Sequence, residues 1–385
     1  MLFPRTCVML RRVCLAVCFA AATPAWSAEP IERDREGPFE LLDGDRVALI
    51  GNTLFEREQS FGDWEHELTR RYPDRHITFR NLGWSGDRPS GISRKRFGNV
   101  EEGFQHLRKS IELVRPTVVL INYGANAAHE GEAGHAPFFA ELDQLFALLE
   151  PIGARLVLVS PMEHEHMGEP LPNPAAYNAQ VRALRDAMKE YAQAKNCDFA
   201  DLVEHFQRAS TQANDSVEPT DAWTDNGIHF SPYGYWRSAP VFARSLGLQP
   251  LPKWSMELDA KGQLIHAAGV AVDNVSAKTE PARFELSFKA ADKAMPRATV
   301  PPHAPEGAQQ FADARTMQLR GLSPGNYRLT VDGQPVATAP AEEWARGVTW
   351  TTGPSFAQAN ELREVIRRKN ELFFHRYRPQ NETYL

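Results

Sequence analysis

The chain has 385 residues, of which 42% are hydrophobic and 24% charged, with 43 basic side chains against 49 acidic ones. This length is ample for one or two domains with buried cores. The net charge of −6 argues against binding to nucleic acid or to an anionic membrane surface, so the sequence predicts neither partner.

Residues 1–27 are typical of a signal peptide. Three arginines precede the short apolar run 13–22, and Ala25-Trp26-Ser27 offers a cleavage site. The apolar run is too short to span a bilayer, so we expect no membrane insertion after cleavage. The sequence therefore predicts an exported protein, either periplasmic or extracellular.

Cleavage would change the charge and the cysteine content of the chain. It would remove three arginines, which leaves a net charge of about −9, and three of the four cysteines. Cys197 alone would remain, so the mature chain could form no intrachain disulfide. Its stability must come from a hydrophobic core.

Residues 30–248 alternate short β-branched runs with amphipathic stretches. This pattern predicts an α/β domain, a three-layer sandwich around a mostly parallel sheet. The expected strands, in chain order, are 46–50, 76–81, 117–122, 155–160 and a shorter one at 198–203. The expected helices are 61–71, 137–149, 175–194 and 233–246.

Residues 250–354 have a different, turn-rich pattern that predicts a small β-rich module. Strands are expected at 284–288 and 327–331, and the turn Asp332-Gly333 is typical of a hairpin. The proline- and alanine-rich stretch 290–308 is expected to be a loop. Residues 355–385 begin with a predicted helix and end without a polar tail, which is compatible with a longer natural protein.

Five short blocks lie at the ends of the expected strands or before the last helix. They are Gly51-Asn52-Thr53, Asn81-Leu82-Gly83, Gly124-Ala125-Asn126, the strand and loop 156–161, and Asn226-Gly227-Ile228-His229. In an open α/β sheet the active site gathers at the carboxyl ends of the strands. We therefore expect the first three blocks to lie along one edge of the sheet.

The order and spacing of the blocks resemble those of the SGNH, or GDSL-type, hydrolases. This resemblance implies an SGNH/flavodoxin-like fold and hydrolysis of an ester without cofactor or metal. The family's first block is Gly-Asp-Ser, and here Thr53 takes the place of the nucleophilic serine. Its last block is Asp-Gly-x-His, and here Asn226 takes the place of the triad aspartate.

The resemblance also implies a role for each matching residue. Thr53 would be the nucleophile and His229 the general base. The oxyanion donors would be the N–H groups of Thr53 and Gly83 and the side-chain amide of Asn126. A glycine at position 83 would let the substrate oxygen approach the backbone.

The two substitutions weaken the expected catalysis. Threonine keeps a hydroxyl, but its methyl group crowds the tetrahedral carbon. Asn226 can orient an imidazole yet cannot stabilise an imidazolium, and in serine proteases the corresponding change lowers turnover about 10⁴-fold. Asp225 or a backbone carbonyl could orient His229 instead.

Other residues near the blocks have alternative interpretations. Ser85, in a near match to the G-x-S-x-G motif, is a second candidate nucleophile. Trp84, Tyr123 and His129 are weak candidates for substrate contact, because sugar rings stack on such side chains, although aromatic residues are more often core. The sequence Glu163-His164-Glu165-His166 is more typical of a polar loop than of a metal site.

Two classes of function follow. The first is an exported esterase that removes an acyl group, possibly acetyl, from a carbohydrate or small-molecule ester through an acyl-enzyme. The alternative is a catalytically impaired protein that acts as a glycan-binding or cell-surface interaction module. The sequence does not indicate the oligomeric state.

Overall fold

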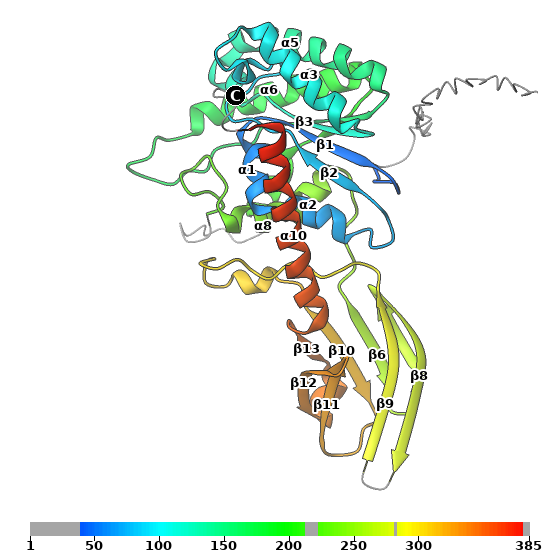
Figure 1. Cartoon of the computed structure of the whole chain (residues 1–385). Coiled ribbons are helices and arrows are strands. Elements are labelled where there is room, and N and C mark those ends of the chain that lie inside the picture. Colours follow the sequence, from blue (N-terminus) through cyan, green and yellow to red (C-terminus); the bar gives the residue numbers. More distant parts are fainter. Residues whose placement is uncertain (1–38, 212–221, 281–282, 380–385) are drawn as a thin grey trace, which may run out of the picture. The chain divides into compact units, whose positions relative to one another are not determined.

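The structure is a computed structural model that describes residues 39–211, 222–280 and 283–379 (Figure 1). The predicted signal peptide lies outside these residues. Within the described ranges, no helix combines the length and the apolar character needed to cross a membrane.

A five-stranded parallel sheet forms the centre of the first half of the chain, as predicted. Its strand order is β2-β1-β3-β4-β5, and every pairing is parallel. The strands are β1 (Arg46–Gly51), β2 (Thr78–Asn81), β3 (Val118–Asn122), β4 (Arg155–Val159) and β5 (Asp198–Ala200). The last strand is shorter than expected, because a helix already begins at Leu202.

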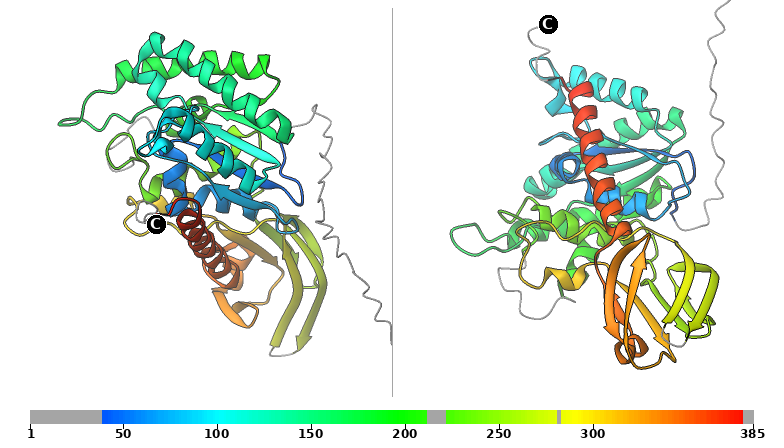
Figure 2. Two further views of the ribbon diagram at one scale, coloured as in Figure 1. Left: turned by 45° about the horizontal axis from the view of Figure 1, so that its top comes forward. Right: turned by 60° about the horizontal axis from the view of Figure 1, so that its bottom comes forward.

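Helices cover both faces of this sheet (Figures 1 and 2). Side chains of a strand alternate between the two faces, so Ala48 and Ile50 join one core cluster and Val47 and Leu49 the other. The first cluster packs against α3, α5 and α6, and the second against α1, α2 and α8. The helices are α1 (Thr53–Phe61), α2 (Asp63–Arg70), α3 (Val100–Val114), α4 (Ala125–His129), α5 (His135–Leu149), α6 (Ala175–Ala194), α7 (Leu202–Thr211) and α8 (Pro232–Ser245). Three short 3₁₀ helices at Ile92–Lys95, Gly131–Gly134 and Glu150–Ile152 complete this part.

The following part is a β-rich module, as predicted. A four-stranded sheet of order β13-β10-β6-β7 is accompanied by two hairpins, β8-β9 and β11-β12. The elements are β6 (Ser255–Asp259), β7 (Leu264–Ala268), β8 (Val270–Glu280), β9 (Arg283–Asp292), a 3₁₀ helix at Ala308–Phe311, β10 (Arg315–Arg320), β11 (Asn326–Val331), β12 (Gln334–Pro340), α9 (Ala341–Arg346) and β13 (Val348–Trp350). Asp332 and Gly333 both have positive φ, as the predicted two-residue turn requires.

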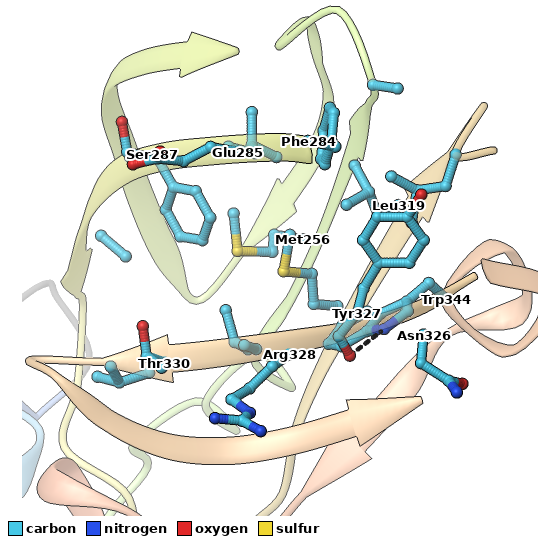
Figure 3. Close-up of a pocket in the computed structure, with 18 of the residues that line it drawn as sticks. Met256, Phe284, Glu285, Ser287, Leu319, Asn326, Tyr327, Arg328, Thr330 and Trp344 are labelled. Carbon is cyan, nitrogen blue, oxygen red and sulfur yellow. Dashed lines mark hydrogen bonds between the residues drawn. The ribbon is translucent and has the colours of Figure 1, made fainter. Parts of the chain in front are cut away.

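The two hairpins and the sheet border a hollow of about 1140 Å³ that is partly open to solvent (Figure 3). Phe284 from β9 and Tyr327 from β11 line it with their ring centres 5.9 Å apart, and Met256 and Leu319 of the sheet line it as well. Most side chains of β8 and β9 are exposed or half-buried, whereas nearly all those of β1 and β3 are buried. The protein encloses the strands of this hairpin less completely than the central strands of the sheet domain.

The last helix, α10 (Pro354–Tyr377), connects the β module with the sheet domain (Figure 2). Phe356 near its start belongs to the core of the β module, whereas Tyr377 at its end belongs to the core of the sheet domain. Between them, Lys369 pairs with the buried Glu65 of α2 at 2.5 Å. The helix predicted at 355–375 is thus confirmed, and its final turn lies against the sheet domain.

Candidate active site

Thr53 stands where the first strand passes into the first helix. It is the first residue of α1, and Asn52 caps the helix by accepting a hydrogen bond from the Leu54 N–H at 3.4 Å. N–H groups in a first turn have no partner within the helix and carry partial positive charge. The Thr53 side chain is half-buried and remains open to a second loop.

Gly86 is the residue of that second loop which approaches Thr53. Its N–H lies 3.4 Å from Thr53 Oγ1, and its carbonyl accepts a hydrogen bond of 3.0 Å from Asn126 Nδ2. Gly86 has φ of +70° and is exposed. Three residues from three strand ends therefore meet at one place, as the block pattern predicted for Thr53 and Asn126.

Gly83 does not have the geometry expected of an oxyanion donor. Its N–H is buried and donates to Asn81 Oδ1 at 2.9 Å. A Cβ at this position would collide with the backbone of Glu56 in α1. Gly83 therefore permits the loop to pack on α1, and the exposed N–H of Gly86, which points at Thr53 Oγ1, takes the position expected of the Gly83 N–H from the sequence.

A buried ion pair fixes the loop that carries Gly86. Asp87 Oδ2 lies 2.6 Å from Arg94 Nε, and neither side chain is accessible to solvent. Tyr123 Oη also donates to this carboxylate at 3.3 Å. Removing one member would leave a buried charge without its partner, which is costly.

The end of α10 fixes the same loop from another side. Tyr377 Oη donates to the Gly83 carbonyl at 3.0 Å. Arg378 pairs with Glu56 at 2.6 Å, and the second oxygen of Glu56 accepts from the Ser85 N–H at 2.6 Å and from the Ser85 hydroxyl. Arg378 thus supports the loop that carries Gly86 through its ion pair with Glu56.

Trp84 and Tyr123 are not placed to contact a substrate. Tyr123 is fully buried, and burial raises the pKa of its phenol. Trp84 is also buried, with the Arg378 guanidinium 3.6 Å from its ring centre. Both side chains support the loop instead of lining an accessible surface.

The last block forms a tight turn whose centre is the Asn226 side chain. Asn226 Oδ1 accepts from the N–H groups of Ile228 at 3.2 Å and His229 at 2.9 Å. These two bonds fix the oxygen, so Asn226 Nδ2 is directed at His229 Nδ1, 3.1 Å away. If the oxygen and nitrogen of the Asn226 amide exchanged places, both hydrogen bonds from the backbone would be lost.

This arrangement selects one tautomer of His229. Because Asn226 Nδ2 is a donor, His229 Nδ1 must accept, and the proton of the neutral ring lies on Nε2. An aspartate would instead accept from Nδ1–H and leave Nε2 free to act as a base. Within the described residues, no hydrogen bond joins the Thr53 hydroxyl to the His229 ring.

Two charged side chains act on His229: Arg57 of α1 and Asp225 of the last turn. Burial and the positive charge of Arg57 lower the pKa of His229, and the carboxylate of Asp225 partly opposes this shift. Asp225 pairs with Arg57 at 3.6 Å and is largely exposed. Its side chain therefore faces Arg57 and does not orient the imidazole in this structure.

Glu165 holds the turn of the last block in place. Its carboxylate accepts from the N–H groups of Trp223 at 3.0 Å and Thr224 at 2.8 Å, and from the Thr224 hydroxyl. Thr224 Oγ1 in turn accepts from the Gly227 N–H at 3.0 Å. This support was not recognised from the sequence, where Glu165 belonged to a polar loop.

Three rings form a small stack beside the site. The His164 ring lies 3.9 Å from that of Tyr177, and the exposed His129 ring lies 4.3 Å from the same tyrosine. Burial, together with the nearby imidazoles of His129 and His229, lowers the pKa of His164 to about 4. The His129 and His229 imidazoles therefore both lie near His164, and the His129 ring is accessible.

The remaining candidates have structural partners. The Ser85 hydroxyl donates to Glu56, Glu163 pairs with Arg182, and His164 stacks on Tyr177. In the part of the chain that the structure describes, no group of three or more His, Cys, Asp or Glu side chains could hold a metal ion.

The comparison with protein families agrees with the fold and with the converging blocks. The GDSL-like lipase/acylhydrolase family matches residues 44–237, half of the chain, including all five blocks. The chain belongs to this family and is a hydrolase of ester bonds. No curated protein matches the chain.

Two solved structures are similar to this chain to different degrees. The gut microbial diltiazem-metabolizing enzyme BT4096 is 18% identical, with a TM-score of 0.65 over 91% of this chain and 84% of that one. Axe2, an acetylxylan esterase from Geobacillus stearothermophilus, is 19% identical, with a TM-score of 0.41 over 55% of this chain and 98% of that one. The first similarity extends over both the sheet domain and the β module.

Proposed function

We propose that this protein is an exported esterase that removes an acyl group, with acetyl as the first candidate, from a carbohydrate. One observation carries the catalytic part of the proposal: the Gly86 N–H donates to the Thr53 hydroxyl, and the Asn126 amide donates to the carbonyl of the same glycine. Export is supported by the signal-like residues 1–27. The sugar is supported by export and by the accessible ring of His129 beside Tyr177.

The proposed reaction has two steps. Thr53 Oγ1 attacks the ester carbonyl, and its proton passes to His229 and then to the departing alcohol. The developing oxyanion takes the Gly86 N–H away from Thr53 and is also held by Asn126. Water then hydrolyses the acyl-enzyme, with His229 again as base. Each oxyanion donor contributes about 100- to 1000-fold in rate.

The experiment is hydrolysis of acetylated xylo-oligosaccharides and of a chromogenic acetate by the purified protein. Thr53→Ala and His229→Ala should each lower kcat/KM about 100-fold or more, whereas Thr53→Ser should retain or increase it. Thr69→Ala serves as the matched control, because this threonine lies in α2 and not in α1. Equal activity in wild type and both alanine variants would falsify this mechanism.

A second candidate function is glycan binding with little turnover. The observation that favours it is the His229 tautomer, because Asn226 Nδ2 places the ring proton on Nε2, the nitrogen that should act as the base. This candidate expects glycan binding by the wild type and a gain of hydrolysis in Thr53→Ser combined with Asn226→Asp. Absence of binding to acetylated and unacetylated xylo-oligosaccharides would exclude it.

A further inference from the structure

Asn226 is exposed at a turn, and the residue that follows it, Gly227, is buried. Asparagine deamidates most readily before glycine, because no side chain hinders attack by the next backbone nitrogen on the amide carbon. We propose that Asn226 is a self-modification site, at which deamidation produces the aspartate that the catalytic histidine requires. The modification itself is independent of the proposed function, and only its effect on turnover rests on that function.

The backbone nitrogen that must attack already has a route for its proton. The Gly227 N–H donates to Thr224 Oγ1 at 3.0 Å, and the Thr224 hydroxyl donates to the Glu165 carboxylate. Thr224 is buried, so this relay is shielded from competing water. A positioned base of this kind typically accelerates proton transfer about 100-fold or more.

The carbonyl that is attacked also has donors. Asn226 Oδ1 accepts from the N–H groups of Ile228 at 3.2 Å and His229 at 2.9 Å. These donors would stabilise the negative charge that develops on this oxygen, as in an oxyanion hole. The leaving nitrogen, Asn226 Nδ2, lies 3.1 Å from His229 Nδ1, which accepts its hydrogen bond and fixes its position.

The reaction balances with water as the only co-reactant. Gly227 N forms a bond to Asn226 Cγ, and the bond from Cγ to Nδ2 breaks. The proton lost from Gly227 N goes to Glu165 through Thr224, and the departing nitrogen takes up a proton from water and leaves as ammonia. Water opens the resulting succinimide between Gly227 N and Cγ, which gives aspartate without any oxidation or reduction.

The product would correct the tautomer of His229. Aspartate at position 226 keeps one oxygen on the two backbone N–H groups and puts its second oxygen where Nδ2 now lies. That oxygen accepts from Nδ1–H and leaves Nε2 of His229 free as the base. A chain that is poorly active as synthesised would therefore become more active as it ages.

The experiment incubates freshly purified protein in mildly alkaline buffer and follows residue 226 by peptide mass spectrometry with a fragmentation method that separates aspartate from isoaspartate. We expect conversion of Asn226 to aspartate, while Asn326, which precedes a tyrosine, keeps its amide. Thr224→Val and Glu165→Gln should each slow the conversion about tenfold or more. Because Thr224 is buried, Glu165→Gln keeps the test decisive if Thr224→Val folds poorly.

Activity is measured on the same samples. It should rise in proportion to the aspartate fraction toward that of Asn226→Asp, and Asn226→Gln should neither convert nor gain activity. An amide that persists at 226 or conversion only to isoaspartate would overturn the proposed modification. If Asn226→Asp is active, activity that stays constant as aspartate forms would overturn its proposed effect on turnover. If Asn226→Asp itself hydrolyses no ester, the proposed function fails, and the mass measurement still decides whether the modification occurs.

Discussion

The sheet domain and the β module are packed in different ways. In the sheet domain, helices cover both faces of the parallel sheet, and the central side chains of β1 and β3 are almost fully buried. In the β module, hairpins β8-β9 and β11-β12 each pair only within themselves among the strands that the structure describes, and they border a hollow of about 1140 Å³. Precise positioning of catalytic groups thus coincides with the tightly packed part, and we expect the β module to tolerate change.

Breaking an ion pair is expected to change the free energy of unfolding much more in the sheet domain than in the β module. Arg94→Leu should lower the free energy of unfolding by about 3–5 kcal/mol, because it leaves Asp87 buried without its partner. Arg283→Leu, which breaks an exposed pair with Glu285 in the β module, should cost less than about 1 kcal/mol. Urea unfolding of both variants measures this, and similar values for the two would contradict the comparison.

Truncating a leucine is also expected to cost more stability in the sheet domain than in the β module. Leu120→Ala removes a fully buried side chain from β3 and should cost about 2–5 kcal/mol. Leu329→Ala borders the hollow from β11 and should cost about 1 kcal/mol, because the side chain already lacks neighbours on one side. Thermal unfolding in both variants tests this, and an equal loss would indicate that the hollow closes in solution.

A third change tests whether α10 belongs functionally to the sheet domain. Arg378→Ala releases Glu56 and with it the Ser85 N–H next to Gly86, so kcat should fall about tenfold with little change in KM. Arg376→Ala is the matched control, because this exposed arginine forms no hydrogen bond or ion pair with any residue that the structure describes. Partial recovery in Arg378→Lys would separate positioning from loss of fold.

The smallest expected effect is on the pH dependence. His229 must be neutral to act as a base, and burial and Arg57 lower the pKa of its ring. The acidic limb of kcat/KM should therefore have its midpoint below the usual histidine value of about 6.5, with activity rising as the pH increases. Arg57→Gln should move the midpoint to higher pH, whereas Arg75→Gln, remote from the site, should leave it unchanged.

Sequence patterns predicted the sheet because its strands are short, apolar and β-branched, and buried parallel strands require this. They predicted the position of Thr53 and Asn126 because strand ends in such sheets lie at one edge. Among the elements that these patterns did not predict are β8 and α3. The residues of β8 mix small, polar and charged side chains, and no helix was predicted over the residues of α3.

Local sequence patterns could not decide whether Gly83 or Gly86 supplies the oxyanion donor. Both glycines follow the same strand, and only the contact of the Gly83 N–H with Asn81 Oδ1 removes it from consideration. The one sequence feature that sets Gly86 apart is the aspartate that follows it, Asp87, which the structure buries. The contribution of Tyr377 and Arg378 left no such signal, because it depends on contacts across almost the whole chain.

The position of α10 also bears on how the enzyme can be divided. A fragment that ends near residue 248, where the sequence pattern changes, would contain every block yet lack Tyr377 and Arg378. The smallest working unit is therefore discontinuous in sequence. A shortened version would join α8 to α10 through a linker in place of the β module, and circular permutation would be safest with a new terminus in the tip of β11-β12.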